Sequence, residues 1–216
     1  MKAPIPSITR SVRAGFTLVE LLAVMLILSI LLAVLVPNLF SGGEAVGTSS
    51  TRAFLSQLSA EIDAYENKMG DYPRSVFAKD LDPKPTTVNM GIEMLVIALM
   101  PADTSYRTAT NYDDRLINTD GDDTKRSLTR FTNSEAFELK DHWDNPIAYL
   151  HRRSYAKGGV YRTYSSDEGD WVEQRVTGAI NPATGDPFRP DSFQLISAGS
   201  DGVFGTEDDI GNFRKP

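Results

Sequence analysis

The C-terminal segment from Ser197 to Ile210 combines closely spaced acids with glycines. Its acids and glycines are Gly199, Asp201, Gly202, Gly205, Glu207, Asp208 and Asp209. Glycines favour the tight turns of a winding loop, and calcium binds six to eight hard oxygen ligands from carboxylates, hydroxyls and carbonyls. The residues therefore predict calcium binding near the C-terminus.

A second acidic stretch runs from Asn118 to Asp123. It resembles half of a calcium loop, but it lacks the glutamate expected at the twelfth position of an EF-hand. Residues 102–132 around it show no sustained hydrophobic period, which favours a solvated surface insertion. We therefore do not predict a cation site in this stretch.

Other chemistry has little support in the composition. The absence of cysteine excludes disulfides, thiolate zinc sites and thiol catalysis, and two histidines, His142 and His151, do not favour a multi-histidine metal site. The sequence contains no serine nucleophile elbow, phosphate loop or helical His-Glu zinc motif. A net charge of −7 argues against nucleic-acid binding, which needs a basic surface. We expect no enzymatic activity and no nucleic-acid partner.

An apolar block over residues 16–40 contains one ionisable side chain, Glu20. As a helix the block is long enough to cross the roughly 30 Å apolar core of a bilayer, and the basic residues before it favour a cytoplasmic N-terminus. A carboxylate in this setting costs on the order of 2.5 kcal/mol or more and marks a functional site. Glu20 is therefore the first candidate functional residue.

A small residue, Gly15, precedes the apolar block, whereas an ordinary secretory signal has its small-residue cleavage site after the apolar region. Cleavage between Gly15 and Phe16 would keep the apolar helix as an anchor and create an amine on Phe16. In a helix this amine lies one turn from Glu20. The two charges can meet within one subunit or between neighbouring subunits.

The segment from Gly15 to Leu22 resembles the processing site of type IV pilins and type II secretion pseudopilins. The resemblance implies cleavage by the membrane prepilin peptidase after Gly15 and methylation of the Phe16 amine. It also implies a filament whose core is a bundle of these helices, with Glu20 as an assembly residue.

Two further segments resemble the major pseudopilin of type II secretion. The loop from Ser197 to Ile210 is similar to the calcium site of that family, and Asp141 to Tyr149 is similar to its Asp-x-Trp-Gly-Asn-Pro-x-x-Tyr segment. The resemblance implies calcium ligands from side chains at Ser197, Asp201, Asp208 and Asp209 and from backbone oxygens near Leu195 and Val203.

The middle of the chain predicts helices. Apolar residues recur at helical spacing from Phe54 to Met69, and Gly70 with Pro73 ends this amphipathic stem helix. Proline and glycines between residues 37 and 47 predict a kink or a melted stretch before it. A short buried helix is expected from Asn89 to Met100, with Asn89 as its N-cap.

The C-terminal third predicts strands. Short segments rich in aromatic and β-branched residues are Pro146 to Leu150, Val160 to Tyr164 and Phe193 to Ser197. We expect an α+β, pilin-like fold, in which a long N-terminal helix with a transmembrane half and an amphipathic half packs on a small antiparallel sheet. The predicted parts are a leader (1–15), a transmembrane helix (16–40), a stem helix (41–70) and a periplasmic head (71–216) with the calcium loop.

The sequence and the resemblance together favour a major pseudopilin, a structural subunit of a type II secretion filament that helps to export folded proteins across the outer membrane. The expected location is the bacterial inner membrane, with the head in the periplasm. The expected partners are copies of itself, the prepilin peptidase, other pseudopilins and the inner-membrane assembly platform. The alternatives are a type IV pilin for adhesion, motility or DNA uptake, a minor pseudopilin, and an anchored periplasmic enzyme or binding domain.

Overall fold

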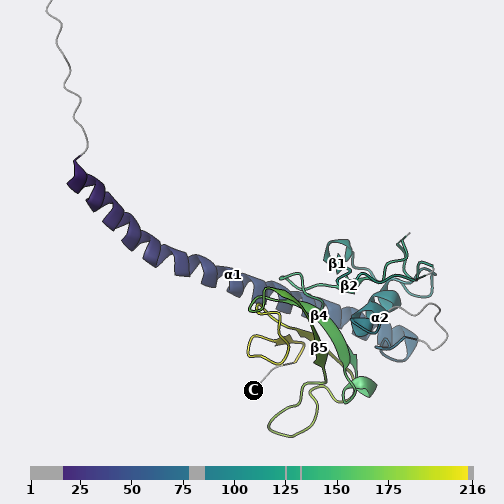
Figure 1. Cartoon of the computed structure of the whole chain (residues 1–216). Helices are drawn as coiled ribbons and strands as arrows, with labels where there is room; N and C mark the ends of the chain where they lie inside the picture. The colour runs from purple at the N-terminus through teal and green to yellow at the C-terminus, as the bar shows by residue number, and fades with distance from the viewer. Residues whose placement is uncertain (1–16, 78–85, 125, 132, 214–216) are drawn as a thin grey trace, which may run out of the picture. The chain divides into compact units, whose positions relative to one another are not determined.

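The chain divides into two compact units, and a computed structural model describes it over residues 17–77, 86–124, 126–131 and 133–213, without the side chains of 34–42. The units are Met1–Gly43 and Glu44–Pro216. The boundary falls inside helix α1 (Leu18–Met69), the long ribbon that changes from purple to blue in Figure 1. Each unit is considered by itself below.

The described part of the first unit is the N-terminal half of α1. Its side chains from residue 17 to residue 33 are all exposed. Among the helices of the described residues, none combines the length and the apolar character needed to cross a bilayer. The transmembrane helix predicted over 16–40 includes Phe16 and the side chains of 34–40, which lie outside the described residues, and it stays a prediction.

Helix α1 is not melted between residues 37 and 47, so this part of the sequence prediction is wrong. Proline and glycine weaken a helix, by about 3 and 1 kcal/mol respectively, but a long hydrogen-bonded ladder with packing on one side can continue through them. Gly47 also has a packing role, because a Cβ added there would lie 2.6 Å from the Trp143 ring. The Trp143 ring thus packs against the stem helix at Gly47.

In the second unit, the amphipathic part of α1 supplies one wall of the hydrophobic core. Phe54, Leu58 and Ile62 are buried, as their helical spacing predicts. The helix ends where Gly70 adopts a φ of 85° and donates its N–H to the Glu66 carbonyl at 2.7 Å. Glycine adopts this left-handed conformation without strain, which explains the predicted stop.

Helix α2 (Met90–Leu99) is buried against the same core, as predicted. Asn89 is the N-cap residue of α2, as predicted, but its side chain makes no capping hydrogen bond. The Asn89 side chain instead donates from Nδ2 to Glu138 Oε1 at 2.7 Å and accepts from the Arg162 N–H at 2.9 Å. The buried Asn89 amide thus bonds to residues far away in the chain instead of to the first turn of α2. A local sequence pattern cannot show which of these two kinds of partner an asparagine takes.

Within the described residues, the strands form three small antiparallel sheets in the order β1-β2, β3-β6-β7 and β4-β5. Their bounds are Leu116–Ile117 (β1), Glu138–Leu139 (β2), Ala148–His151 (β3), Gly159–Ser165 (β4), Asp170–Val176 (β5), Phe193–Ser197 (β6) and Ile210–Gly211 (β7). The described part of the chain also has 3₁₀ turns at Asp113–Arg115 and Arg152–Ser154. Figure 1 shows β4 and β5 as a paired hairpin. The three predicted strands are confirmed as β3, β4 and β6, and so is the α+β class.

Residues 102–132 are not only a solvated insertion, in contrast with the sequence prediction. Thr108 and Tyr112 are buried, and the Thr108 hydroxyl donates to Glu61 Oε2 of α1 at 2.6 Å. The ring of Tyr112 packs edge-on against Phe54, with centroids 6.0 Å apart. The segment covers the stem helix through isolated contacts without a repeating period, which is why periodicity did not show them.

Candidate functional site

The first turn of α1 holds Glu20 in a reciprocal hydrogen-bonded cap. Both the N–H and the hydroxyl of Thr17 donate to Glu20 Oε2, each at 2.9 Å, and the Glu20 N–H donates to Thr17 Oγ1 at 3.2 Å. This is the capping-box arrangement of a helix N-terminus. The sequence analysis missed Thr17, although the Thr-x-x-Glu spacing before an apolar run is the signal for this cap.

The predicted processing residues lie at the edge of this cap. Gly15 and Phe16 are outside the described residues, so cleavage, methylation and the pairing of the Phe16 amine with Glu20 stay predictions. Within the described residues, Thr17 is the residue that the structure brings to the Glu20 carboxylate.

Asp208 is the centre of the C-terminal loop. Its Oδ2 accepts hydrogen bonds from the N–H groups of Ser200 and Asp201, at 2.7 and 3.1 Å, and from the Ser200 hydroxyl at 3.1 Å. Its Oδ1 accepts from the Thr206 hydroxyl at 2.6 Å. Burial raises the pKa of Asp208, but these hydrogen bonds outweigh burial and hold the pKa below its usual value.

A glycine makes this arrangement possible. Gly199 has a φ of 68°, and a Cβ at this position would lie 2.4 Å from Asp208 Oδ2. The loop can close over the carboxylate because no side chain is present there.

The other predicted acidic ligands also accept N–H groups of the loop. Asp201 Oδ1 accepts from the Val203 N–H at 2.7 Å, and Asp209 Oδ2 accepts from the Gly205 N–H at 2.9 Å. The Val203 carbonyl oxygen lies 3.1 Å from the Thr206 hydroxyl and shares its proton with the nearer Asp208 Oδ1. The structure therefore brings Asp201, Val203, Asp208 and Asp209 into one hydrogen-bonded loop.

The remaining two predicted ligands have other partners. Ser197 is buried and donates its hydroxyl to Asp141 Oδ2 at 2.6 Å, and the Leu195 carbonyl accepts from the Asn212 N–H at 3.1 Å. Asp141 Oδ1 accepts the N–H groups of Trp143 and Asn145 at 2.8 and 3.0 Å. Burial raises the pKa of Asp141 to about 6 despite these hydrogen bonds.

Asp141 is a residue whose role the sequence analysis did not assign. It joins the turn before β3 to the end of β6, so it anchors the strand from which the C-terminal loop departs. The resemblance of the Asp141 to Tyr149 segment was the signal available in the sequence. The contact itself joins residues far apart in the chain, and spacing does not show it.

The ligand atoms that the C-terminal loop offers are carboxylate, hydroxyl and carbonyl oxygens, which are the ligands that calcium prefers. In the described conformation, N–H and hydroxyl donors already occupy the carboxylates of Asp201, Asp208 and Asp209. Ser197 and the Leu195 carbonyl are engaged with Asp141 and Asn212. Calcium binding by this loop stays a prediction, in which the ion replaces some of these donors.

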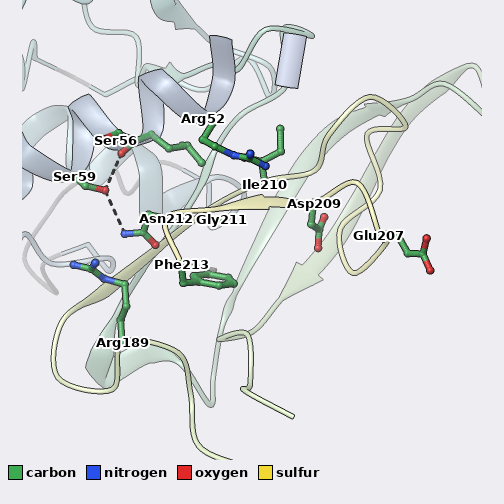
Figure 2. A pocket seen from close by; sticks show the side chains of 11 residues that line it. Arg52, Ser56, Ser59, Arg189, Glu207, Asp209, Ile210, Gly211, Asn212 and Phe213 are labelled. Atoms are coloured by element: carbon green, nitrogen blue, oxygen red, sulfur yellow. Dashed lines mark hydrogen bonds between the residues drawn. The ribbon is translucent and has the colours of Figure 1, made fainter. Parts of the chain in front are cut away.

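A cleft of about 850 Å³ separates the stem part of α1 from the C-terminal segment. Figure 2 shows Asn212 directed at Ser59 of α1, to which its amide donates at 3.3 Å. Arg52 and Arg189 line the cleft together with Glu207 and Asp209, so its surface carries both signs of charge. The cleft brings the stem helix and the C-terminal loop onto one surface of the second unit.

Part of the chain is similar to known proteins. Residues 10–36 match the family model described as the prokaryotic N-terminal methylation motif. Competence protein ComGC of Halalkalibacterium halodurans is 41% identical over 54 residues, which are 25% of this chain and 53% of that protein. The ComG operon protein 3 homolog of Bacillus licheniformis is 36% identical over 52 residues, which are 24% of this chain and 54% of that protein.

These similarities concern a limited part of the chain. The chain spans about half the length of the curated relatives it matches. No solved structure matches the chain. The family-model match covers only residues 10–36. What is said of the head is therefore inferred from its own structure.

Proposed function

We propose that this chain is a filament subunit assembled through α1. The premise is that the chain is a type IV pilin-like protein with a class III signal peptide. Pilin-like proteins of this class are structural rather than enzymatic, in agreement with the sequence prediction that the chain is not an enzyme. The prepilin peptidase as processing enzyme and other pilin-like subunits as partners follow from the same premise.

The observation that carries the proposal is the apolar surface of α1. Between Leu18 and Leu32 its large apolar side chains keep between 48% and 75% of their surface exposed, on all sides of the helix. A helix that is apolar all round is stable only when lipid or other apolar helices cover it. Membrane lipid covers this surface before assembly in the proposed sequence of events, and helices of other subunits cover it in the filament.

Glu20 gives this apolar surface a specific contact. Its carboxylate is the single acid in the stretch from Leu18 to Leu32. The Thr17 cap keeps the carboxylate at the N-terminal end of α1, where a positive amine of another subunit is the chemically matched partner. We assign the pairing of Glu20 with the Phe16 amine of a neighbour as the assembly contact.

A type II secretion pseudopilus is the filament that we favour. The chain has no cysteine to close the C-terminal loop with a disulfide, and instead the Asp208 carboxylate gathers that loop through hydrogen bonds. The resemblance of this loop and of the Asp141 segment to the major pseudopilin supports the assignment. The protein then sits in the inner membrane with its head in the periplasm, and its filament helps folded proteins through the outer membrane.

A competence filament is the second candidate. The names of the two relatives, a competence protein and a ComG operon protein homolog, favour it, and each matches about a quarter of the chain. Deletion of the gene in its host separates the two functions. We expect secreted enzymes to accumulate in the periplasm while transformation by added DNA stays unchanged. Normal secretion with lost transformation would establish the competence function instead.

Calcium binding by the C-terminal loop is a further part of the proposal. A ligand that binds only the folded state stabilises it by about 2.7 kcal/mol when present at 100 times its Kd. We expect 5 mM calcium, relative to EGTA, to raise the melting temperature of the full-length chain in detergent by roughly 5 °C or more. The Asp208→Asn variant should lose a clear part of this shift, because Asp208 is the acid at the centre of the loop. Thermal unfolding of both proteins over a calcium titration checks the prediction, and an identical shift in both proteins would remove Asp208 from the site.

A further inference from the structure

Three acids from two separate segments meet on one side of α2. Glu93 lies in the first turn of α2, and Asp120 and Asp122 lie in the loop between β1 and β2. One carboxylate oxygen from each of the three residues can be chosen so that all lie within 4.8 Å of one another. Two oxygens bound to the same calcium ion at 2.3–2.6 Å lie at most about 5 Å apart, so this spacing is that of ligands to one ion.

Glu93 has no hydrogen-bond partner although it is fully buried. Its side chain has 0% of its surface exposed, and neither Oε1 nor Oε2 is hydrogen-bonded within the described residues. Leaving a buried carboxyl group without a partner is unfavourable, and more so when the group is charged. Protonation does not remove the problem, because the resulting O–H would also need an acceptor. The described residues therefore leave both Glu93 oxygens open to a further partner.

The two aspartates are fixed so that each presents one free oxygen. Thr86 donates its N–H to Asp122 Oδ2 at 2.7 Å and its hydroxyl to Asp120 Oδ2 at 2.5 Å. The other oxygen of each residue, Oδ1, is buried and has no hydrogen-bond partner within the described residues. Thr86 thus holds both carboxylates in place and leaves one lone-pair-bearing oxygen of each to the cluster.

The electrostatics of the cluster are unfavourable without a cation. Burial, followed by the charges of Asp122, Asp120 and Glu138, raises the pKa of Glu93 to about 11. Burial and Asp120 likewise raise the pKa of Asp122 to about 6. None of the ion pairs formed by the described residues involves these acids. A bound cation would supply the missing opposite charge.

Glu138 supports the cluster from outside. It is buried, and it accepts hydrogen bonds from Asn89 Nδ2 at 2.7 Å and from the Thr119 N–H at 3.1 Å. Both Glu138 carboxylate oxygens thus already accept hydrogen bonds. Thr119, one of the donors, directly precedes Asp120. This contact fixes the start of the loop that carries Asp120 and Asp122, so the two sides of the cluster are held together by the fold.

We propose that Glu93, Asp120 and Asp122 bind a calcium ion that joins helix α2 to the β1–β2 loop. Carboxylate oxygens are the ligands of hard divalent cations, and the cluster contains no imidazole or thiolate that would favour zinc or copper. Backbone carbonyls and water complete the coordination that three carboxylates leave open. The site is separate from the C-terminal loop and does not depend on the proposed filament function.

Calcium titration of the full-length chain in detergent tests this site. We expect isothermal titration calorimetry, after removal of metal with EGTA, to show calcium binding with a Kd of about 1 mM or tighter. Glu93→Gln should abolish that binding event, because it replaces a ligand by a neutral group of the same shape. In EGTA the same variant should melt within about 2 °C of the natural protein, because it removes no hydrogen bond.

Asp208→Asn is the matched control, since it removes an acid from the C-terminal loop and leaves the cluster intact. It should keep the binding event that Glu93→Gln loses. Asp120→Asn gives a second route if Glu93→Gln does not fold, because Asp120 is less buried than Glu93. Retention of the same calcium binding by both cluster variants would overturn the proposal. Absence of calcium binding up to 10 mM in the natural chain would also overturn it and identify Glu93 as a neutral buried acid.

Discussion

Replacing Glu20 by alanine is expected to leave the protein in the membrane, cleaved at its N-terminus, and to abolish filaments. Alanine keeps the helix, and the apolar side chains from Leu18 to Leu32 are unchanged, so insertion and processing do not need the carboxylate. Assembly does need it, because the amine created on Phe16 would otherwise enter an apolar bundle without a counter-charge. An unpaired buried charge costs about 3–5 kcal/mol when its partner is removed, and this cost recurs at every subunit.

Two control variants separate assembly from helix capping. Thr17→Ala removes the cap that Thr17 makes with Glu20 but keeps the carboxylate. We expect filaments from it, with a loss of about 1 kcal/mol in helix stability at most. Glu44→Ala removes an exposed acid from the same helix and should assemble normally. Electron microscopy of filaments and mass spectrometry of the mature N-terminus give the two readouts. Normal filaments from Glu20→Ala would contradict the assembly contact.

Replacing Gly91 by alanine is expected to destabilise the head strongly, although alanine is the better helix former. A Cβ at Gly91 would lie 2.2 Å from the Tyr161 hydroxyl oxygen and 2.3 Å from the Tyr149 carbonyl oxygen. The Tyr161 hydroxyl also donates to that carbonyl at 2.8 Å and accepts the Tyr149 N–H at 3.0 Å, so neither atom can move freely. We expect a net loss of about 2 kcal/mol, which lowers the melting temperature by roughly 4–8 °C.

Gly43→Ala is the matched control for this prediction. Gly43 also lies in a helix, but a Cβ there would meet no heavy atom within 4 Å. Alanine at this position should leave the melting temperature unchanged or raise it slightly, because helix propensity favours alanine by up to about 1 kcal/mol. Thermal unfolding of both variants in the same detergent measures the difference. Equal melting temperatures for the two variants would show that α2 is not packed against β3 as described.

Local patterns in the sequence were sufficient to predict the stem helix and three of the strands. The spacing of Phe54, Leu58 and Ile62 predicted the buried face of the stem helix, and Gly70 predicted its end. Three strand segments were predicted from their composition. Strand β5 was missed because its residues are mostly polar and its pairing with β4 covers little core surface. The prediction of a melted stretch between residues 37 and 47 was wrong. It rested on helix propensity alone, which does not include tertiary contacts such as that of Trp143 with Gly47.

The sequence by itself determined the features that identify the N-terminal helix as a processed anchor. A single acid in an apolar helix and a small residue before it are local features, and the match over residues 10–36 supports their interpretation. The tertiary structure alone decided which acids come together. The sequence predicted a solvated surface insertion for Asp120 and Asp122, but the fold of the loop places them against Glu93 of α2. Spacing along a chain determines periodicity and turns, whereas contacts between distant segments depend on how the core closes, and burial then changes what a carboxylate can bind.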